Sequence, residues 1–255
     1  MPLYLQQFIF GVLPIGLRVG GLMSFAPFVG SASIPPQIKA VLTLVVTALI
    51  YPVCHVPPIA STLAGWIRIV LGEVTMGLAI GLCLQFVLEG AQVAGQLVGF
   101  QFAFSLVNVI DPQTNVDTPV LSIFYQLLAL LFFLQFNVHH WLLRGVAKSF
   151  EYAPVGSLVI NSAVLHSFFH AAGAMWLVGV QIASPVILAT MLLDITIGFL
   201  TKASPQMPAI FLSIPMKILV GYAVMAISFG LWPAVFEKEF AIALAWSERL
   251  FHLAH

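Results

Sequence analysis

The chain has 255 residues, of which 61% are hydrophobic and only 7% are charged, and its formal net charge is zero. Because an ordinary soluble domain carries about 25% charged residues, this composition excludes a water-soluble single-domain enzyme. The zero net charge and the lack of a Lys/Arg cluster also exclude nucleic-acid binding, which needs a basic surface to displace counterions from phosphates. Most of the surface must therefore contact lipid or other protein.

The first apolar stretch is expected to remain in the mature protein. No positive residue precedes Arg18, whereas a cleaved signal peptide begins with a positive region. The two cysteines, Cys54 and Cys83, lie in apolar surroundings without Cys-x-x-Cys spacing. We therefore expect buried thiols and neither a zinc site nor a disulfide framework.

Long apolar runs dominate the rest of the chain, and a helix needs about 20 such residues to span a bilayer. The charge-free runs and turn signals predict apolar helices near residues 8–33, 38–51, 63–88, 90–108, 119–145, 164–200 and 209–236. We expect an all-α, membrane-associated protein of helical hairpins, organised as one domain over residues 1–255. These segments do not all have to cross the bilayer, because 63–88 and 90–108 could form one bent helix or a hairpin inside protein.

Six charged residues lie within or beside the apolar segments. Each would cost about 2.5–3.5 kcal/mol at a lipid-facing bilayer centre, so we expect them to face protein or water. This favours a multi-subunit helical assembly in which lipid contacts only part of the surface. The six residues are Arg18, Arg68, Glu73, Glu89, Asp194 and Lys217.

Small residues recur at spacings of four between Gly77 and Ala103, which predicts a face where another helix backbone approaches closely. An adjoining face carries polar residues at spacings of four, three and four, and lipid would leave these groups unpaired. Two interpretations remain open for the polar face: hydrogen bonds between helices, or a pore lining or subunit interface. The packing residues are Gly77, Gly81, Ala91, Gly95, Gly99 and Ala103, and the polar residues are Gln85, Glu89, Gln92 and Gln96.

An irregular segment follows this helix. Pro112 disfavours a helical Asp111, and Pro119 has the same effect on Thr118, so the helix is expected to end before them. Irregular backbone at membrane depth is allowed only inside protein or against water. The residues by themselves favour a simple turn outside the membrane.

The histidines suggest a metal or haem site, because His166 and His170 are one helical turn apart and His139 adjoins His140. No carboxylate or cysteine nearby completes a ligand set, so we expect interfacial or hydrogen-bonded histidines and no cofactor. The sequence also lacks Gly-x-Ser-x-Gly, His-Glu-x-x-His and Walker-type motifs. We therefore predict that the protein is not an enzyme.

Prolines interrupt the connection between the last two long apolar segments. Pro205, Pro208 and Pro215 lie there, between or beside Lys202 and Lys217. Because proline donates no backbone hydrogen bond, this pattern predicts a broken or sharply turned helical hairpin. The lysines would meet lipid headgroups or acidic partner residues, although a simple interfacial turn explains the prolines equally well.

Several of these blocks together resemble the FliR family of flagellar type III secretion export-gate proteins (FliR/SpaR/YscT-like). The resemblance covers nearly the whole chain. The blocks are the run from Gly95 to Gln101, the pairs Asp111-Pro112 and Phe136-Asn137, and the segment Pro205-Gln206-Met207 followed by Pro215-x-Lys217. Leu106 and Val109-Ile110 stand where that family often has Phe, so an aliphatic seal is expected here.

The resemblance implies a bacterial inner-membrane, multi-pass subunit of the flagellar basal body. Such a subunit resembles a fusion of FliP and FliQ, and with FliP- and FliQ-type subunits it builds a spiral conduit for unfolded flagellar proteins. FlhB/FlhA-type export proteins and membrane lipid would be further partners. The alternatives are a small-solute secondary transporter and the homologous subunit of a virulence injectisome.

The resemblance also implies roles for particular residues. The segment from Ser105 to Pro119 would act as a plug that closes the conduit. The spacing of the small residues, by contrast, is what predicts that Gly95 and Gly99 hold helices close together. The gate residues implied are Ser105, Leu106, Val109, Ile110, Asp111 and Pro112, and the hairpin residues are Pro205, Gln206, Pro215 and Lys217.

Overall fold

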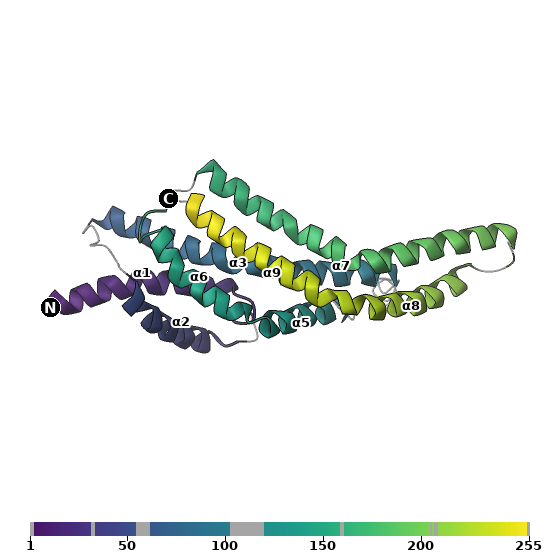
Figure 1. Cartoon of the computed structure of the whole chain (residues 1–255), viewed down its shortest axis with the longest axis horizontal. Coiled ribbons are helices and arrows are strands. Elements are labelled where there is room, and N and C mark those ends of the chain that lie inside the picture. Colours follow the sequence, from purple (N-terminus) through teal and green to yellow (C-terminus); the bar gives the residue numbers. More distant parts are fainter. Residues whose placement is uncertain are drawn as a thin grey trace, which may run out of the picture. The chain divides into compact units, whose positions relative to one another are not determined.

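The computed structural model describes residues 3–31, 34–54, 62–102, 120–158, 161–204, 206 and 209–253 (Figure 1). All regular structure in these ranges is helical, which confirms the predicted all-α class. The elements are α1 (Leu3–Phe25), α2 (Pro36–Ile50), the 3-10 helix η1 (Tyr51–Val53), α3 (Leu63–Gln101), α5 (Val120–Gln135), α6 (Val138–Tyr152), α7 (Ser162–Ala203), α8 (Ala209–Ser228), the 3-10 helix η2 (Phe229–Leu231) and α9 (Trp232–Leu253).

Helix α3 joins two segments that the sequence pattern separates. The predicted helices 63–88 and 90–108 are one continuous helix of 39 residues, which ends at Gln101. Glu89 and Gly90 do not interrupt it, because neither removes a backbone hydrogen bond as a proline would. Gly90 lies against α7, where a Cβ atom would be 2.9 Å from the Met175 carbonyl oxygen.

The predicted helix 119–145 is wrong as a single element. It is divided into α5 and α6, whose axes differ by 67° across Phe136 and Asn137. Asn137 has φ 55°, in the left-handed region that Asn tolerates better than most residues. A residue in this conformation ends α5 and lets α6 begin in a new direction.

Other boundaries also differ from the predicted ones. The first helix ends at Phe25 and not at residue 33, because Pro27 disfavours a helical Ala26. The predicted helix 209–236 ends at Ser228, and α9 then extends to Leu253. The start of α7 at Ser162 is capped by Asn161, whose side-chain oxygen accepts a hydrogen bond of 2.8 Å from the Val164 N–H.

Four helical stretches in the described part of the chain are long and apolar enough to cross a membrane, and α5 with α6 would make a fifth if the bent pair is one span. The predicted segments 63–88 and 90–108 form one of these stretches, and the apolar helix Gly11–Phe25 is shorter than the four. The four stretches are Pro36–Val53, Leu63–Gln101, Ser162–Ala203 and Leu212–Leu250.

The chain divides into two compact units. Unit 1 comprises Met1–Phe86, Phe133–Gly173 and Phe240–His255, and unit 2 comprises Val87–Phe132 and Ala174–Glu239. Helices α3, α5, α7 and α9 each contribute to both units. The prediction of one export-gate domain over residues 1–255 stays a prediction.

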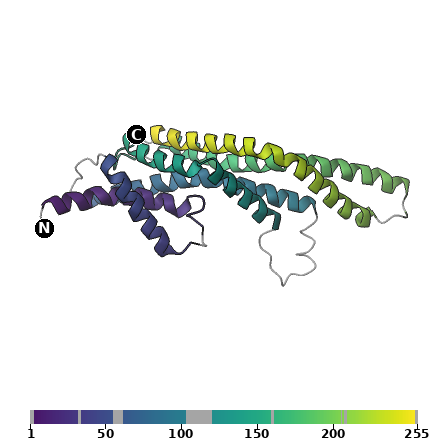
Figure 2. The same cartoon turned by 60° about the horizontal axis from the view of Figure 1, so that its bottom comes forward.

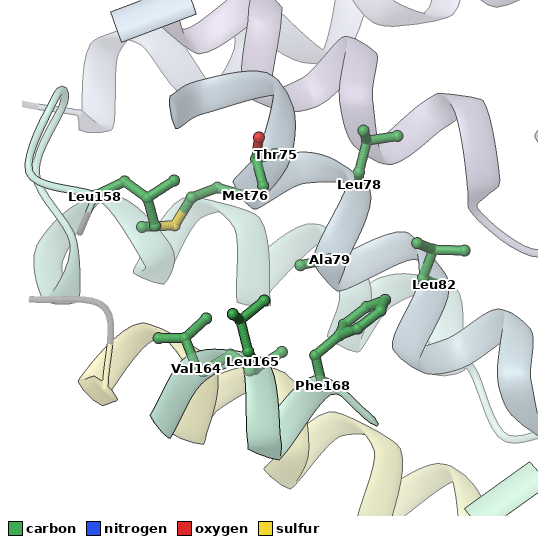
Figure 3. Close-up of a pocket in the computed structure, with 10 residues that line it drawn as sticks. Thr75, Met76, Leu78, Ala79, Leu82, Leu158, Val164, Leu165 and Phe168 are labelled. Atoms are coloured by element: carbon green, nitrogen blue, oxygen red, sulfur yellow. The ribbon is translucent and has the colours of Figure 1, made fainter. Parts of the chain in front are cut away.

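Unit 1 contains the α1–α2 hairpin and the first part of α3. Its interior includes Ile15, Val19 and Leu22 from α1, all fully buried. A cavity of about 280 Å³ lies between α3 and α7 in this unit. Figure 3 shows Met76 and Ala79 of α3 facing Val164 and Phe168 of α7 across it, with the Thr75 hydroxyl turned away from these side chains.

Unit 2 contains the rest of α3, most of α5 and α7, the whole of α8 and the start of α9. Within it α8 runs back beside the C-terminal part of α7, as both views show (Figures 1 and 2). Its core includes an aromatic contact between Tyr125 of α5 and Trp232, with ring centroids 4.7 Å apart. Phe132 and Phe236 stack nearby along the same two helices, at 5.2 Å.

Both units leave large apolar side chains exposed. Leu44 and Leu49 on α2 are about 70% exposed in unit 1, and Leu177 and Phe199 on α7 are equally exposed in unit 2. Exposed apolar surface of this extent is unfavourable in water. These faces therefore need lipid or another protein as their environment.

Candidate functional site

A buried ion pair connects three helices of unit 1. Arg18 on α1 is fully buried, and its Nε donates a hydrogen bond of 2.6 Å to Glu73 Oε2 on α3. Its other nitrogens donate to the Ser149 hydroxyl at 2.8 Å and to the Ala153 carbonyl at 3.0 Å, at the end of α6. The guanidinium carbon also lies 3.9 Å from the ring centroid of Phe150. The guanidinium is therefore held by charge, hydrogen bonds and an aromatic face together.

The partner carboxylate is held equally well. Glu73 is 2% exposed, and its Oε1 accepts a hydrogen bond of 3.1 Å from the Gly156 N–H. Gly156 has φ 77°, a left-handed conformation that favours glycine, and it lies in the turn after α6. This arrangement confirms that Arg18 and Glu73 face protein. The sequence marks both charges but does not indicate that they pair across 55 residues.

The small residues in the first part of α3 lie against α1. A Cβ atom on Gly77 would overlap the Arg18 carbonyl oxygen, and one on Gly81 would lie 2.9 Å from the Leu22 carbonyl oxygen. The contact has a counterpart on α1 that the sequence analysis missed. A Cβ atom on Gly21 would be 2.5 Å from the Val74 carbonyl oxygen. Glycines on both helices thus let the two backbones touch.

The later small residues of α3 lie in the interior of unit 2. Ala91 is fully buried, and a Cβ atom on Gly95 would be 2.5 Å from the Ser122 Cα on α5. Gly99 is buried as well, and Ala103 lies outside the described residues. The structure therefore places Gly77 and Gly95 against two different helices, α1 and α5.

The four polar residues of α3 are all half-buried. Gln85, Glu89, Gln92 and Gln96 have the spacing of one helical face, and each keeps part of its side chain accessible. Partial exposure is compatible with both interpretations left open by the sequence. The polar interface stays a prediction.

The predicted hairpin after α7 contains an ion pair. Lys217 of α8 lies 2.7 Å from Asp194 of α7, and their side chains are 18% and 44% exposed. Helix α8 continues through Pro215, which is exposed, and Gln206 lies exposed in the connection. The lysine thus meets an acidic residue of its own chain, which the sequence analysis did not foresee. Pro205 lies outside the described residues.

The segment predicted as the gate also lies outside the described residues. This applies to Ser105, Leu106, Val109, Ile110, Asp111 and Pro112. What the structure describes is the helix end before this segment and the helix start after it. The last described residue before it, Phe102, is 1% exposed, and Val120 after it begins α5.

The histidines take part in ring contacts. His139 and His140 have ring centroids 4.2 Å apart, and His170 stacks on Trp246 at 4.6 Å. Among the described residues, no three His, Cys, Asp or Glu side chains come together as a possible metal site. The cavity in unit 1 is lined by apolar surface, so it offers no group to orient a polar substrate.

These features define a class of protein: an all-α, multi-pass membrane protein that buries charges in pairs and packs its helices at glycine contacts. Over residues 9–243 the chain matches the family described as "Bacterial export proteins, family 1". The chain therefore belongs to this family of bacterial export proteins.

Similar proteins include several described as "Flagellar biosynthetic protein FliR". The one from Escherichia coli (strain K12) is 31% identical over 212 residues, which is 82% of this chain and 80% of that protein. The one from Bacillus subtilis (strain 168) is 25% identical over 244 residues, 94% of each chain. The one from Aquifex aeolicus (strain VF5) is 24% identical over 239 residues. The resemblance to the FliR family, and with it the multi-pass inner-membrane location, is confirmed.

Proposed function

We propose that this chain is a non-enzymatic subunit of the flagellar protein export gate. The observation that carries the proposal is the family match over residues 9–243, together with flagellar relatives that align with most of the chain. The relatives favour the flagellar function over an injectisome subunit and over a small-solute transporter. The exposed apolar faces of both units fit a subunit that is covered by lipid and neighbouring proteins.

The partners proposed are FliP- and FliQ-type subunits, which would complete the conduit, and FlhB/FlhA-type export proteins. The ion pair of Lys217 and Asp194 and the polar residues Gln92 and Gln96 are partly exposed on otherwise apolar helices. Polar groups of this kind are satisfied by water or by a neighbouring subunit. The cargo would be unfolded flagellar proteins.

The gate is proposed to be the segment from Ser105 to Pro119. An open conduit wide enough for a polypeptide would dissipate the ion gradient, which is worth about 2.3 kcal/mol per charge per 100 mV. A closed state is therefore necessary when no substrate is present. Support comes from the family membership and from the two prolines, Pro112 and Pro119, in the sequence between α3 and α5.

The function is tested by removing the chain from a flagellated host and restoring it. We expect loss of motility and of hook-protein secretion, and recovery of both when the chain is supplied. Affinity purification of the restored chain from mild detergent should co-isolate FliP- and FliQ-type proteins. Secretion that continues without the chain, or isolation of the chain alone, would contradict the proposal.

The gate is tested by short deletions between Ser105 and Pro119. In cells with the complete export gate, we expect faster collapse of the membrane potential, because the obstruction is shortened. The measurement is fluorescence of a potential-sensitive dye, compared with cells that carry the intact chain. A membrane potential that stays unchanged, with the complex still assembled, would count against a plug.

A further inference from the structure

Within unit 2, the end of α3 contacts α8 at Gly221 and Tyr222, and we call the space left by the missing side chain of Gly221 the notch. Phe102, the residue after Gln101, is 1% exposed. A Cβ atom built on Gly221 of α8 would overlap the Cε1 and Cζ atoms of the Phe102 ring. The neighbouring Tyr222 ring has its centroid 5.0 Å from that of Phe102, at an interplanar angle of 48°. The phenylalanine ring thus fills the space that a side chain at 221 would need.

This contact differs in kind from the other close glycines. At Gly95 and Gly77 a side chain would meet the backbone of another helix, so a substitution would push two helices apart. At Gly221 the three atoms nearest to an added Cβ all belong to the Phe102 ring. An alanine there displaces the Phe102 ring, without forcing a Cβ atom into the backbone of α3.

An ion pair holds α8 against α7 one helical turn before Gly221. Lys217 precedes Gly221 by four residues, on the same side of α8, and pairs with Asp194 of α7 at 2.7 Å. The ion pair therefore fixes the part of α8 that carries Gly221 to α7. Through its contact with Gly221, Phe102 attaches the end of α3 to this fixed part of α8, close to the predicted gate segment.

We infer that Phe102 and Gly221 form an anchor that positions the start of the gate segment by holding the end of α3 on α8. This inference rests on the proposed function, because it assumes that the segment from Ser105 to Pro119 closes a conduit. Phe102 acts as a positioning residue through the contacts of its ring with Gly221 and Tyr222 of α8. Gly221 is required because any side chain at that position would take the ring's place.

The test uses the full chain in cells with the complete export gate. G221A should raise the ion leak several-fold while the complex still assembles, because the displaced ring no longer holds the helix end. The matched control is G198A, on α7 in the same unit, where a Cβ atom would meet nothing within 4 Å. The double variant F102L/G221A should bring the leak back toward the wild-type level, because leucine needs less of the notch than phenylalanine.

The outcomes separate the anchor from the gate itself. The anchor is supported if G221A raises the ion leak, if adding F102L lowers that leak again, and if G198A leaks no more than the wild type. If deletions within Ser105–Pro119 leak but G221A does not, the anchor is wrong and the gate stands. If the deletions themselves do not leak, the gate is wrong and the anchor falls with it. If F102L fails to relieve a leaking G221A, the effect does not act through the Phe102 ring, and the inference is overturned.

Discussion

At the scale of single residues, Arg18 and Glu73 form a buried ion pair in unit 1. Both side chains are almost fully buried, and the guanidinium and the carboxylate have hydrogen-bond partners on α1, α3 and α6 and in the turn at Gly156. A buried ion pair adds little stability over a well-packed apolar pair, but breaking it leaves an uncompensated charge. The main effect of the network is therefore to determine that α1, α3 and α6 pack together, and its net contribution to the free energy of unfolding is small.

Removing one partner should be costly. We expect R18M to destabilise the protein by about 3–5 kcal/mol, because Glu73 then stays buried without its cation. The double variant R18M/E73L should lose less, because no lone charge remains. The measurement is the thermal unfolding midpoint of the detergent-purified export-gate complex that contains the variant.

Arg68 on α3 gives the control for this experiment, since it is exposed. R68M should change stability by no more than about 0.5 kcal/mol, as is usual for surface substitutions. If R18M and R68M shift the midpoint equally, the buried network does not have the role assigned to it.

Cys54 provides a second experiment at this scale. Partial burial raises the pKa of its thiol, although Arg18 acts in the opposite direction. Since only the thiolate reacts rapidly, maleimide labelling of a C83A variant should be slow at neutral pH and should accelerate as the pH rises above the usual thiol pKa. Equal labelling rates at pH 7 and pH 9 would contradict this expectation.

At the scale of elements, the α3 glycines decide how closely helices approach. Gly77 meets the α1 backbone and Gly95 meets the α5 backbone, each in a different unit. Backbone atoms cannot move aside as the end of a side chain can. A single methyl group at either position must therefore separate two helices.

We expect G77A and G95A each to cost about 1–3 kcal/mol, the usual range for overpacking a tight contact. For a protein of this size, this corresponds to a fall in the unfolding midpoint of about 2–4 °C per kcal/mol. The control is G145A on α6, where a Cβ atom would meet nothing. That variant should be neutral or more stable by up to about 1 kcal/mol, through helix propensity. Equal midpoints for all three variants would contradict close backbone packing.

The helices also show which helix contacts and helix ends follow from the sequence pattern and which do not. Small residues at spacings of four predict a packing face, yet they do not tell that α1 meets its first part and α5 its later part. Glu89 and Gly90 look like a break, but α3 continues through them because its helical hydrogen bonds are intact. The real break, at Asn137, depends on one left-handed residue inside an otherwise apolar run.

At the scale of the whole molecule, the exposed apolar residues of both units must be covered by lipid or protein for the chain to be stable. Leu49 on α2 and Leu177 on α7 are each 70% exposed, on helices that carry few charges. Such surfaces are covered by lipid, by partner subunits or by both. The chain by itself leaves them open to aggregation and proteolysis.

We therefore expect the chain to be short-lived in cells that lack its FliP-type partner. After protein synthesis is stopped, immunoblotting should show faster loss of the chain than in cells with the complete gate. The same comparison for an unrelated multi-pass membrane protein controls for general turnover. Equal half-lives with and without the partner would indicate that lipid alone is sufficient to cover the exposed faces.

The sequence by itself determined the solvent, the fold class and the family. With 7% charged residues the chain has too little polar surface for water, and its long apolar runs have only the helix as a way to satisfy the backbone in lipid. These conclusions follow from composition and local pattern, which need no knowledge of distant contacts.

Only the tertiary structure decided which groups meet. The pairing of Arg18 with Glu73, the contact of Gly95 with Ser122 and the insertion of Phe102 at Gly221 each join residues far apart in the chain. Spacing along one helix defines a face but not the helix that covers it, because many apolar partners satisfy the same pattern. The partner is chosen by steric fit and by the cost of leaving a buried charge unpaired, and both exist only once the helices are in contact.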